Sequence, residues 1–167
     1  MNILFDYQIF YLQKFGGISK YFYNLAINLK KKNLNPKILA PISKNYYSKD
    51  LKKNQILDGI CLDKFPKFTS KLIGEYNFIS TNYLISRYNA DIIHLTYYNK
   101  IYKLKLSIPK IITVYDLIHE KYPHYYTKNF HSKKESIKYA DHIICISNNT
   151  KKDLLEYYNI EESKISV

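Results

Sequence analysis

The sequence predicts an α/β protein built as a Rossmann-like parallel sheet with helices on both faces. Short, nearly continuous apolar runs recur along the chain, and stretches with the apolar spacing of helices separate them. Strands that are apolar throughout have to be covered on both faces, which is typical of a parallel sheet whose strands are joined by helices. The 167 residues fit one compact domain, so we expect a single domain over residues 1–167.

The first two predicted elements are a strand and a helix. Residues Asn2 to Phe5 form a short apolar run and are expected to be a buried strand. A helical period follows, with apolar side chains at Ile18, Phe22, Leu25, Ala26 and Leu29. Lysines 30 to 32 suit the negative end of the helix dipole, and Asn33 is expected to end the helix.

The middle of the chain predicts two more strands and a second helix. The run "KILAPI" is expected to be a strand, and Ile60 to Leu62 a third, shorter one. The stretch "SKNYYSKDLKKNQ" between them is polar and basic, and we expect it to be mobile. Residues Ser70 to Tyr88 have helical spacing, although Gly74 weakens this prediction.

Strands and helices also alternate through the C-terminal part. The runs "ADIIHL", "KIITVYD" and "DHIICIS" predict strands, and helical patterns cover Lys128 to Ala140 and Thr150 to Tyr158. The final "KISV" looks like the start of one more strand without a closing helix. This ending indicates a truncated or divided protein.

Two cysteines and the opening residues bear on the cellular compartment. Cys61 and Cys145 are far apart in apolar runs, so we expect free core thiols rather than a disulfide. The chain opens without a basic segment followed by a long apolar one, and no apolar run approaches the ~20 residues of a membrane span. We expect a cytoplasmic protein.

The chain is basic, with a formal net charge of +12. Such a surface attracts phosphates, nucleic acid or anionic lipid, and charge alone does not choose among them. The many lysines, tyrosines, asparagines and isoleucines are equally what an A+T-rich genome would encode without any functional demand.

Adjacent glycines, Gly16 and Gly17, lie between the first strand and the first helix. In sheets of this kind, ligands bind at the carboxyl ends of the strands, where helix N-termini offer free N–H groups. The pair could therefore let the backbone approach a phosphate or a sugar, or could simply serve a tight turn with positive φ. The patterns GxGxxG and GxxxxGK[ST] are absent, which disfavours an ordinary NAD enzyme or nucleoside triphosphatase.

Five stretches occur in register with these elements: "FGGISKYFYNLA", "ADIIHLTYY", "ITVYDLIHEKYP", "ADHIICISNNTKKDLLEYY" and "KISV". Together they resemble the N-terminal half of the family 4 retaining glycosyltransferases, which have the two-domain GT-B fold. The resemblance covers nearly the whole chain. It implies that Gly16 and Gly17 lie beside the donor diphosphate and the reacting sugars, and that Lys20 pairs with an anionic acceptor or phosphate unless it is a solvated surface lysine.

The resemblance also places candidate residues after the later strands. Relatives often have His-Asp where this chain has Tyr115-Asp116, so His119 is expected to substitute for the missing histidine. Asp116 either orients an acceptor hydroxyl or caps the following turn. His94 faces the same edge of the sheet, as a substrate contact or as a structural histidine. Ser147 is expected mainly to cap a helix, with the cleft close by.

The resemblance implies that a C-terminal domain, absent from these residues, binds most of the nucleotide-sugar donor. This chain would then be the acceptor-binding half of a retaining hexosyltransferase acting on a glycan or lipid-linked acceptor, without a cofactor or a metal, and inactive alone. Positioning and stabilisation of the leaving diphosphate would supply the catalysis.

Three other interpretations concern partners. Nine lysines and three acidic residues lie between Lys100 and Lys138, which could hold the domain peripherally on an anionic inner membrane face. A basic, non-enzymatic module that binds nucleic acid or phosphate is the main alternative function, although recognition signatures for nucleic acid are absent. A metal-dependent hydrolase using His119, His124 and His131 is disfavoured because their spacing matches no ligand motif.

Overall fold

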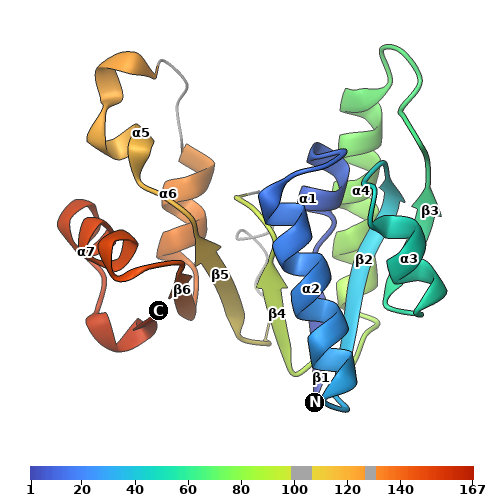
Figure 1. Cartoon of the computed structure of the whole chain (residues 1–167), viewed down its shortest axis with the longest axis horizontal. Coiled ribbons are helices and arrows are strands. Elements are labelled where there is room, and N and C mark those ends of the chain that lie inside the picture. The colour runs from blue at the N-terminus through green and yellow to red at the C-terminus, as the bar shows by residue number, and fades with distance from the viewer. Residues whose placement is uncertain (99–106, 127–130) are drawn as a thin grey trace. The chain divides into compact units, whose positions relative to one another are not determined.

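The structure is a computed structural model and describes residues 1–98, 107–126 and 131–167 (Figure 1). Its backbone contacts divide the chain into two compact units, Met1–Thr96 and Tyr97–Val167. The expectation of a single domain over the whole chain stays a prediction. No helix among the described residues has the length and apolar character needed to cross a membrane.

The first unit contains four parallel strands in the order β3-β2-β1-β4. Their bounds are β1 Asn2–Phe5, β2 Asn35–Ser43, β3 Leu57–Cys61 and β4 Ile92–Leu95. The first and fourth strands are adjacent although most of the unit separates them in sequence, and Phe5 pairs with His94 where they end. The carboxyl ends of β1 and β4 therefore lie side by side, which is where ligands bind in sheets of this kind.

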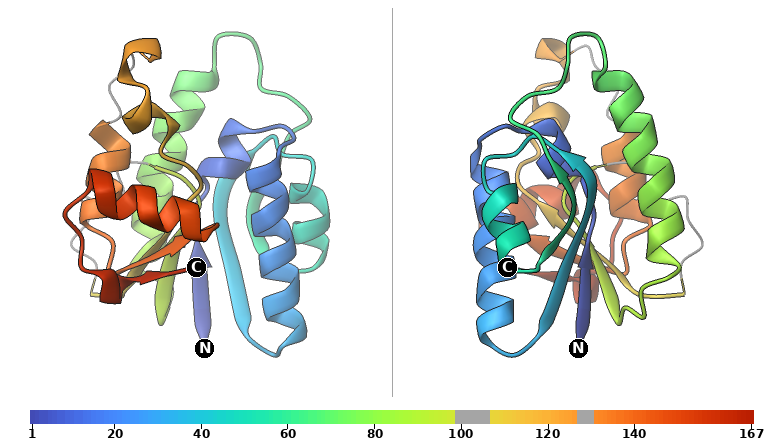
Figure 2. Two further views of the ribbon diagram at one scale, coloured as in Figure 1. Left: turned by 60° about the vertical axis from the view of Figure 1, so that its left-hand side comes forward. Right: turned by 90° about the vertical axis from the view of Figure 1, so that its right-hand side faces the viewer.

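Four helices accompany this sheet: α1 Gln8–Leu12, α2 Gly17–Lys31, α3 Ser48–Lys53 and α4 Ser70–Ile85. Figure 2 shows α2 and α3 on one face of the sheet and α4 on the other. The predicted helix after the glycine pair is α2, whose Phe22 and Ala26 are fully buried. It ends as expected, because Asn33 has a φ of 60° and its N–H donates to the carbonyl of Lys30.

The described residues of the second unit include three parallel strands in the order β5-β6-β7. They are β5 Lys110–Val114, β6 His142–Cys145 and β7 Ile165–Ser166. The helices are α5 Ile118–Lys121, α6 His131–Lys138 and α7 Asn148–Tyr157, with short 3-10 turns at Pro123–Tyr125 and Glu162–Lys164. The expected helix from Lys128 is confirmed from His131 onward, and residues 128–130 lie outside the described residues.

The predicted fold class is confirmed, two local expectations need correction, and one helix was not expected. Strand β3 begins at Leu57, earlier than expected, because Leu57 is buried. The connection expected to be polar and mobile contains helix α3, which Leu51 anchors because its side chain is fully buried. Helix α1, which the sequence analysis did not predict, buries Ile9 and Phe10.

The packing of the chain accounts for the burial of the two cysteines and for the glycine at position 59. Cys61 and Cys145 are both free, as expected, but Cys61 is half-buried rather than in the core. Gly59 lies in β3 with a φ of 148°, and a Cβ atom there would lie 1.8 Å from the carbonyl oxygen of Ala40. Strand β2 therefore approaches this position too closely for any side chain.

Candidate functional site

The glycine pair does not serve a turn with positive φ. Gly16 is the N-cap of α2 with a φ of 174°, an extended conformation that any residue adopts, and Gly17 is the first residue of the helix. A Cβ atom on Gly16 would lie 2.4 Å from the side-chain oxygen of Gln13, whereas one on Gly17 would meet no atom within 4 Å. Backbone strain therefore does not explain Gly17, and the space beside it is open.

The first turn of α2 has free N–H groups at this open side. The Ser19 N–H donates to Gln13 Oε1 at 3.3 Å, and the Lys20 N–H donates to the Gly16 carbonyl at 3.0 Å. Among the described residues, no acceptor serves the N–H groups of Gly17 and Ile18. Two donors at the positive end of a fifteen-residue helix dipole can bind an anion such as a phosphate. The Lys20 side chain is exposed on the same first turn.

A buried polar contact joins the carboxyl ends of β1 and β4. Asp6 follows β1 and Thr96 follows β4, and both side chains are fully buried. The Thr96 N–H donates to Asp6 Oδ1 at 2.7 Å, and the N–H of Ile9, in the first turn of α1, donates to Thr96 Oγ1 at 3.1 Å. The sequence analysis missed this pair, although a carboxylate directly after an apolar strand was a usable signal.

His94 is the next-to-last residue of β4 and lies in the core of the first unit. Its side chain is 4% exposed and lies against Phe5 and Phe22, with ring centroids 5.6 and 5.1 Å apart. Burial lowers the pKa of His94 to about 4, because the charged imidazolium loses its hydration there. A neutral imidazole packed between aromatic rings can hold the end of β4 in position. Direct contact between His94 and a substrate stays a prediction.

Acidification is expected to destabilise the protein through His94. In the folded protein the pKa of His94 is about 4, below the ordinary value of 6.5. The stability that the neutral imidazole contributes is therefore complete above pH 6.5 and is lost as the pH falls toward 4. Between pH 7 and 4.5 we expect a loss of about 2 kcal/mol from this group. Urea unfolding of the wild type and of His94→Gln at both pH values measures it; equal losses in the two proteins would contradict the assignment.

In the second unit, the end of β5 carries Tyr115 and Asp116. The Tyr115 side chain is half-buried and Asp116 is exposed. Asp116 Oδ1 accepts the N–H of Ile118 at 3.3 Å, which is the turn-capping role that the sequence left open. The His119 ring packs edge-on against Tyr126, with centroids 4.3 Å apart. An acceptor-orienting role for Asp116 and His119 stays a prediction.

A buried ion pair holds the Asp116 turn, and the sequence analysis did not single it out. Lys133 is 2% exposed, and its ammonium lies 2.8 Å from the Glu120 carboxylate. It also donates to the carbonyl oxygen of Asp116 at 2.7 Å, while the Tyr158 hydroxyl donates to the other Glu120 oxygen at 2.6 Å. Burial alone would raise the pKa of Glu120, but the hydrogen bonds from Lys133 and Tyr158 lower it overall.

Ser147 caps helix α7. Its Oγ accepts the N–H of Thr150 at 3.1 Å, as an N-cap serine does. The capping role expected of Ser147 is therefore confirmed, and a substrate role stays a prediction. On the same helix, Asp153 pairs with Lys121 at 2.8 Å and so ties α7 to α5.

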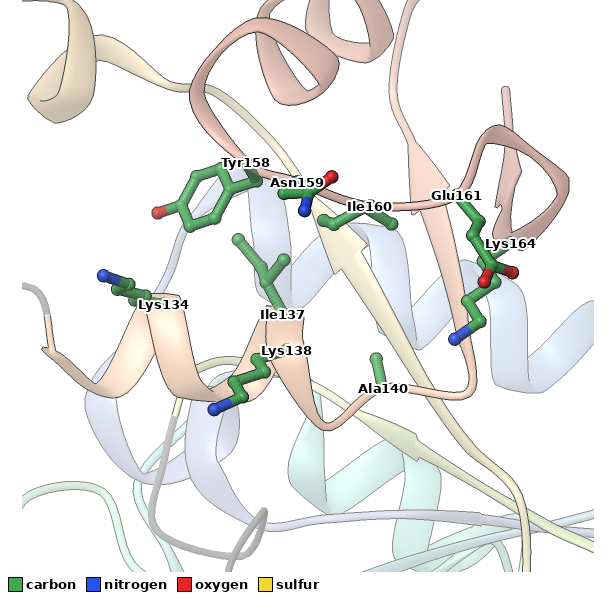
Figure 3. A pocket seen from close by; sticks show the side chains of 9 residues that line it. All are labelled: Lys134, Ile137, Lys138, Ala140, Tyr158, Asn159, Ile160, Glu161 and Lys164. Atoms are coloured by element: carbon green, nitrogen blue, oxygen red, sulfur yellow. The ribbon is translucent and has the colours of Figure 1, made fainter.

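A pocket of about 400 Å³ lies elsewhere in the second unit. Figure 3 shows it between helix α6 and the segment that follows α7, with Lys134 and Lys138 on one side and Tyr158 on the other. None of the predicted site residues lines this pocket. No three histidine, cysteine, aspartate or glutamate side chains of residues 1–98, 107–126 and 131–167 are grouped to hold a metal ion.

Parallel strands accompanied by helices give the chain a Rossmann-like α/β fold. The sequence model of Glycosyltransferase Family 4 matches residues 15–167, and the chain belongs to that family. This confirms the resemblance drawn from the five stretches. The match begins just before the glycine pair and extends through the final strand, so it covers every predicted site residue.

Comparison with solved structures agrees with this assignment. The chain is similar to a structure titled lipopolysaccharide outer core galactosyltransferase WaaB, apo form, with a TM-score of 0.62 and 17% identity. The similarity covers 100% of this chain and 45% of that one, so the chain spans less than half of that protein. At this identity the similarity shows the fold. No curated protein matches the chain.

Proposed function

We propose that this domain is the acceptor-binding half of a retaining hexosyltransferase, which moves a hexose from a nucleotide sugar to a glycan or lipid-linked acceptor. The observation that carries the proposal is the family match over residues 15–167, which includes the open first turn of α2. The 45% coverage of the galactosyltransferase structure supports a second, donor-binding half. By itself the chain is expected to be inactive.

In this proposal the first unit supplies groups for the diphosphate. The N–H groups of Gly17 and Ile18, which have no acceptor among the described residues, belong to a helix N-terminus and would stabilise negative charge that grows on the leaving phosphate. Lys20 would add a cation on the same turn. Asp6, through Thr96, would keep the strand ends and the start of α1 in place.

The second unit supplies groups for the acceptor. Asp116 and His119 would orient the attacking hydroxyl, with Tyr115 and Ser147 as further sugar contacts. Lys133 would hold the Asp116 turn through its carbonyl oxygen, which lies 2.7 Å away. The buried Lys133–Glu120 pair would thus act on the substrate only through Asp116.

Retention follows if the acceptor oxygen attacks the sugar carbon from the face that the diphosphate leaves. The bond between that carbon and the phosphate oxygen breaks, the bond to the acceptor oxygen forms, and the acceptor proton passes to the departing phosphate oxygen. No nucleophile from the protein is consumed. The chain's groups would contribute by holding the reactants and by stabilising the leaving charge.

The test is incorporation of labelled hexose in the native cell. Membranes with cytosol, prepared from cells with and without the gene, are incubated with UDP-linked and GDP-linked labelled hexoses. We expect one donor to lose its incorporation into glycan or lipid in the deletion strain and to regain it on complementation. The anomeric proton signal of the product should match the donor configuration. Unchanged incorporation from every donor would refute the proposal and favour the basic binding module.

A further inference from the structure

Helix α4 presents an apolar face to solvent. Its side chains Leu72, Tyr76, Ile79 and Tyr83 are each more than half exposed. Their spacing of four, three and four residues places them on one face of the helix. Phe68, just before the helix, is 98% exposed. These five side chains are called the α4 stripe below.

The opposite face of α4 buries Ile85 together with two polar side chains that hold the helix on the sheet. Asn77 is fully buried; its amide donates to the Ile42 carbonyl and accepts the Ile42 N–H, both at 2.8 Å. Thr81, also fully buried, donates to the Leu39 carbonyl at 3.4 Å. Turning the helix to bury the α4 stripe would strip these buried groups of their partners. The sheet therefore fixes the stripe on the outside.

Cations border the α4 stripe. Lys64, Lys67 and Lys71 are exposed before and at the start of the helix, and Arg87 is exposed just after its end. The Arg87 guanidinium lies over the Tyr83 ring, 4.3 Å from its centroid. Glu75 is the one acidic residue of α4, and Asp63 pairs with Lys49 at 2.7 Å. The border is thus mainly positive.

We propose that the α4 stripe docks on an anionic lipid bilayer. A helix that lies on a bilayer buries aliphatic side chains in the acyl boundary, keeps tyrosines at the headgroup level and places lysines and arginines against anionic headgroups. The α4 stripe and its border have this combination, and the net charge of +12 adds long-range attraction. A protein partner would not require the flanking cations.

This inference goes beyond the proposed function, because no residue of the α4 stripe belongs to the candidate site. It also differs from attachment through the lysines between Lys100 and Lys138, a stretch that lies partly outside the described residues. Vesicle binding is measured without turnover, so the docking surface and the transfer reaction can fail independently.

The first experiment is sedimentation of the full chain with vesicles of equal phosphatidylglycerol and phosphatidylcholine. The double variant Leu72→Ser/Ile79→Ser should lower the partition coefficient at least about tenfold, because two inserted apolar side chains are lost. The matched control Leu12→Ser/Ile60→Ser removes the same two residue types from exposed positions in the same unit and should bind as the parent does. Pure phosphatidylcholine and high salt should both weaken binding of the parent.

A second measurement uses the absence of tryptophan from the chain. The variant Tyr76→Trp places one reporter in the α4 stripe, and Tyr46→Trp places one at an exposed site of the same unit. We expect a blue shift of emission and quenching by brominated lipid for the first variant alone.

Three outcomes would overturn the proposal: equal binding of the double variant and its matched control, equal emission of the two tryptophan variants on vesicles, or dimerisation abolished by Leu72→Ser/Ile79→Ser without vesicle binding. The last outcome would assign the α4 stripe to a second copy of the chain.

Discussion

Replacing Gly17 by valine should reduce hexose transfer at least about 100-fold while the protein remains folded. A Cβ atom at this position meets nothing within 4 Å, so the substitution begins in open space and we expect the fold to accommodate it. It would, however, fill the space beside the N–H groups of Gly17 and Ile18, where the proposal places the diphosphate. The measurement is incorporation of labelled hexose in deletion cells that carry the variant, together with the urea unfolding midpoint of the purified chain.

The control for Gly17→Val is Asn24→Val, which places the same residue on the exposed side of the same helix. It should retain full transfer. Gly16→Ala provides a second comparison, because its Cβ atom would press on the flexible Gln13 side chain rather than on the open space. Full transfer by Gly17→Val would mean that this helix start does not contact substrate, even if the enzyme is a transferase.

Glu120→Ala is expected to lower the free energy of unfolding by about 3 to 5 kcal/mol. Lys133 is 2% exposed, and the change leaves its ammonium with the Asp116 carbonyl oxygen but without the Glu120 carboxylate. Urea unfolding followed by the near-ultraviolet circular dichroism of the tyrosines measures the loss. The pKa of Glu120 is held below its ordinary value in the folded protein. The stability that the ionised Glu120 carboxylate contributes is therefore complete above the ordinary pKa and is lost as the pH falls through the pKa of the folded state.

Two further variants separate a buried charge from an ordinary contact. Lys151→Ala breaks a pair whose partner, Glu162, is largely exposed, and should cost less than about 1 kcal/mol. Glu120→Leu/Lys133→Met removes both buried charges and should recover most of the stability that Glu120→Ala loses. A loss below about 1 kcal/mol for Glu120→Ala would show that solvent reaches Lys133 more freely than its contacts indicate.

The site was only partly predictable because the relevant groups act through contacts between distant segments. Ser147 was expected as a helix cap from its local sequence, and its hydrogen bond to Thr150 agrees. Lys133 looked like one of many surface lysines, since nothing local indicates that its ammonium is buried against Glu120, thirteen residues earlier. The Asp6–Thr96 contact spans ninety residues and depends on the adjacency of β1 and β4.

Helix α4 shows which part of the fold could be predicted and which part could not. The spacing of its apolar residues predicted a helix, and apolar residues with helical spacing normally face the core. Here Asn77 and Thr81 face the sheet because the carbonyl oxygens of Ile42 and Leu39 and the N–H of Ile42 lie opposite them, and Tyr76 and Ile79 are left outside. The helical period specifies that a helix forms, but not which of its faces the sheet will accept.

The α/β class, most of the strands and helices, and the family could be read from the amino-acid sequence, because the spacing of apolar residues and short motifs are local properties of the chain. Only the folded chain shows that His94 is a buried neutral imidazole, that Lys133 is a buried cation and that the apolar face of α4 is exposed. These properties depend on which atoms from distant segments replace water around a side chain. Burial and hydrogen-bond partners therefore required the folded chain.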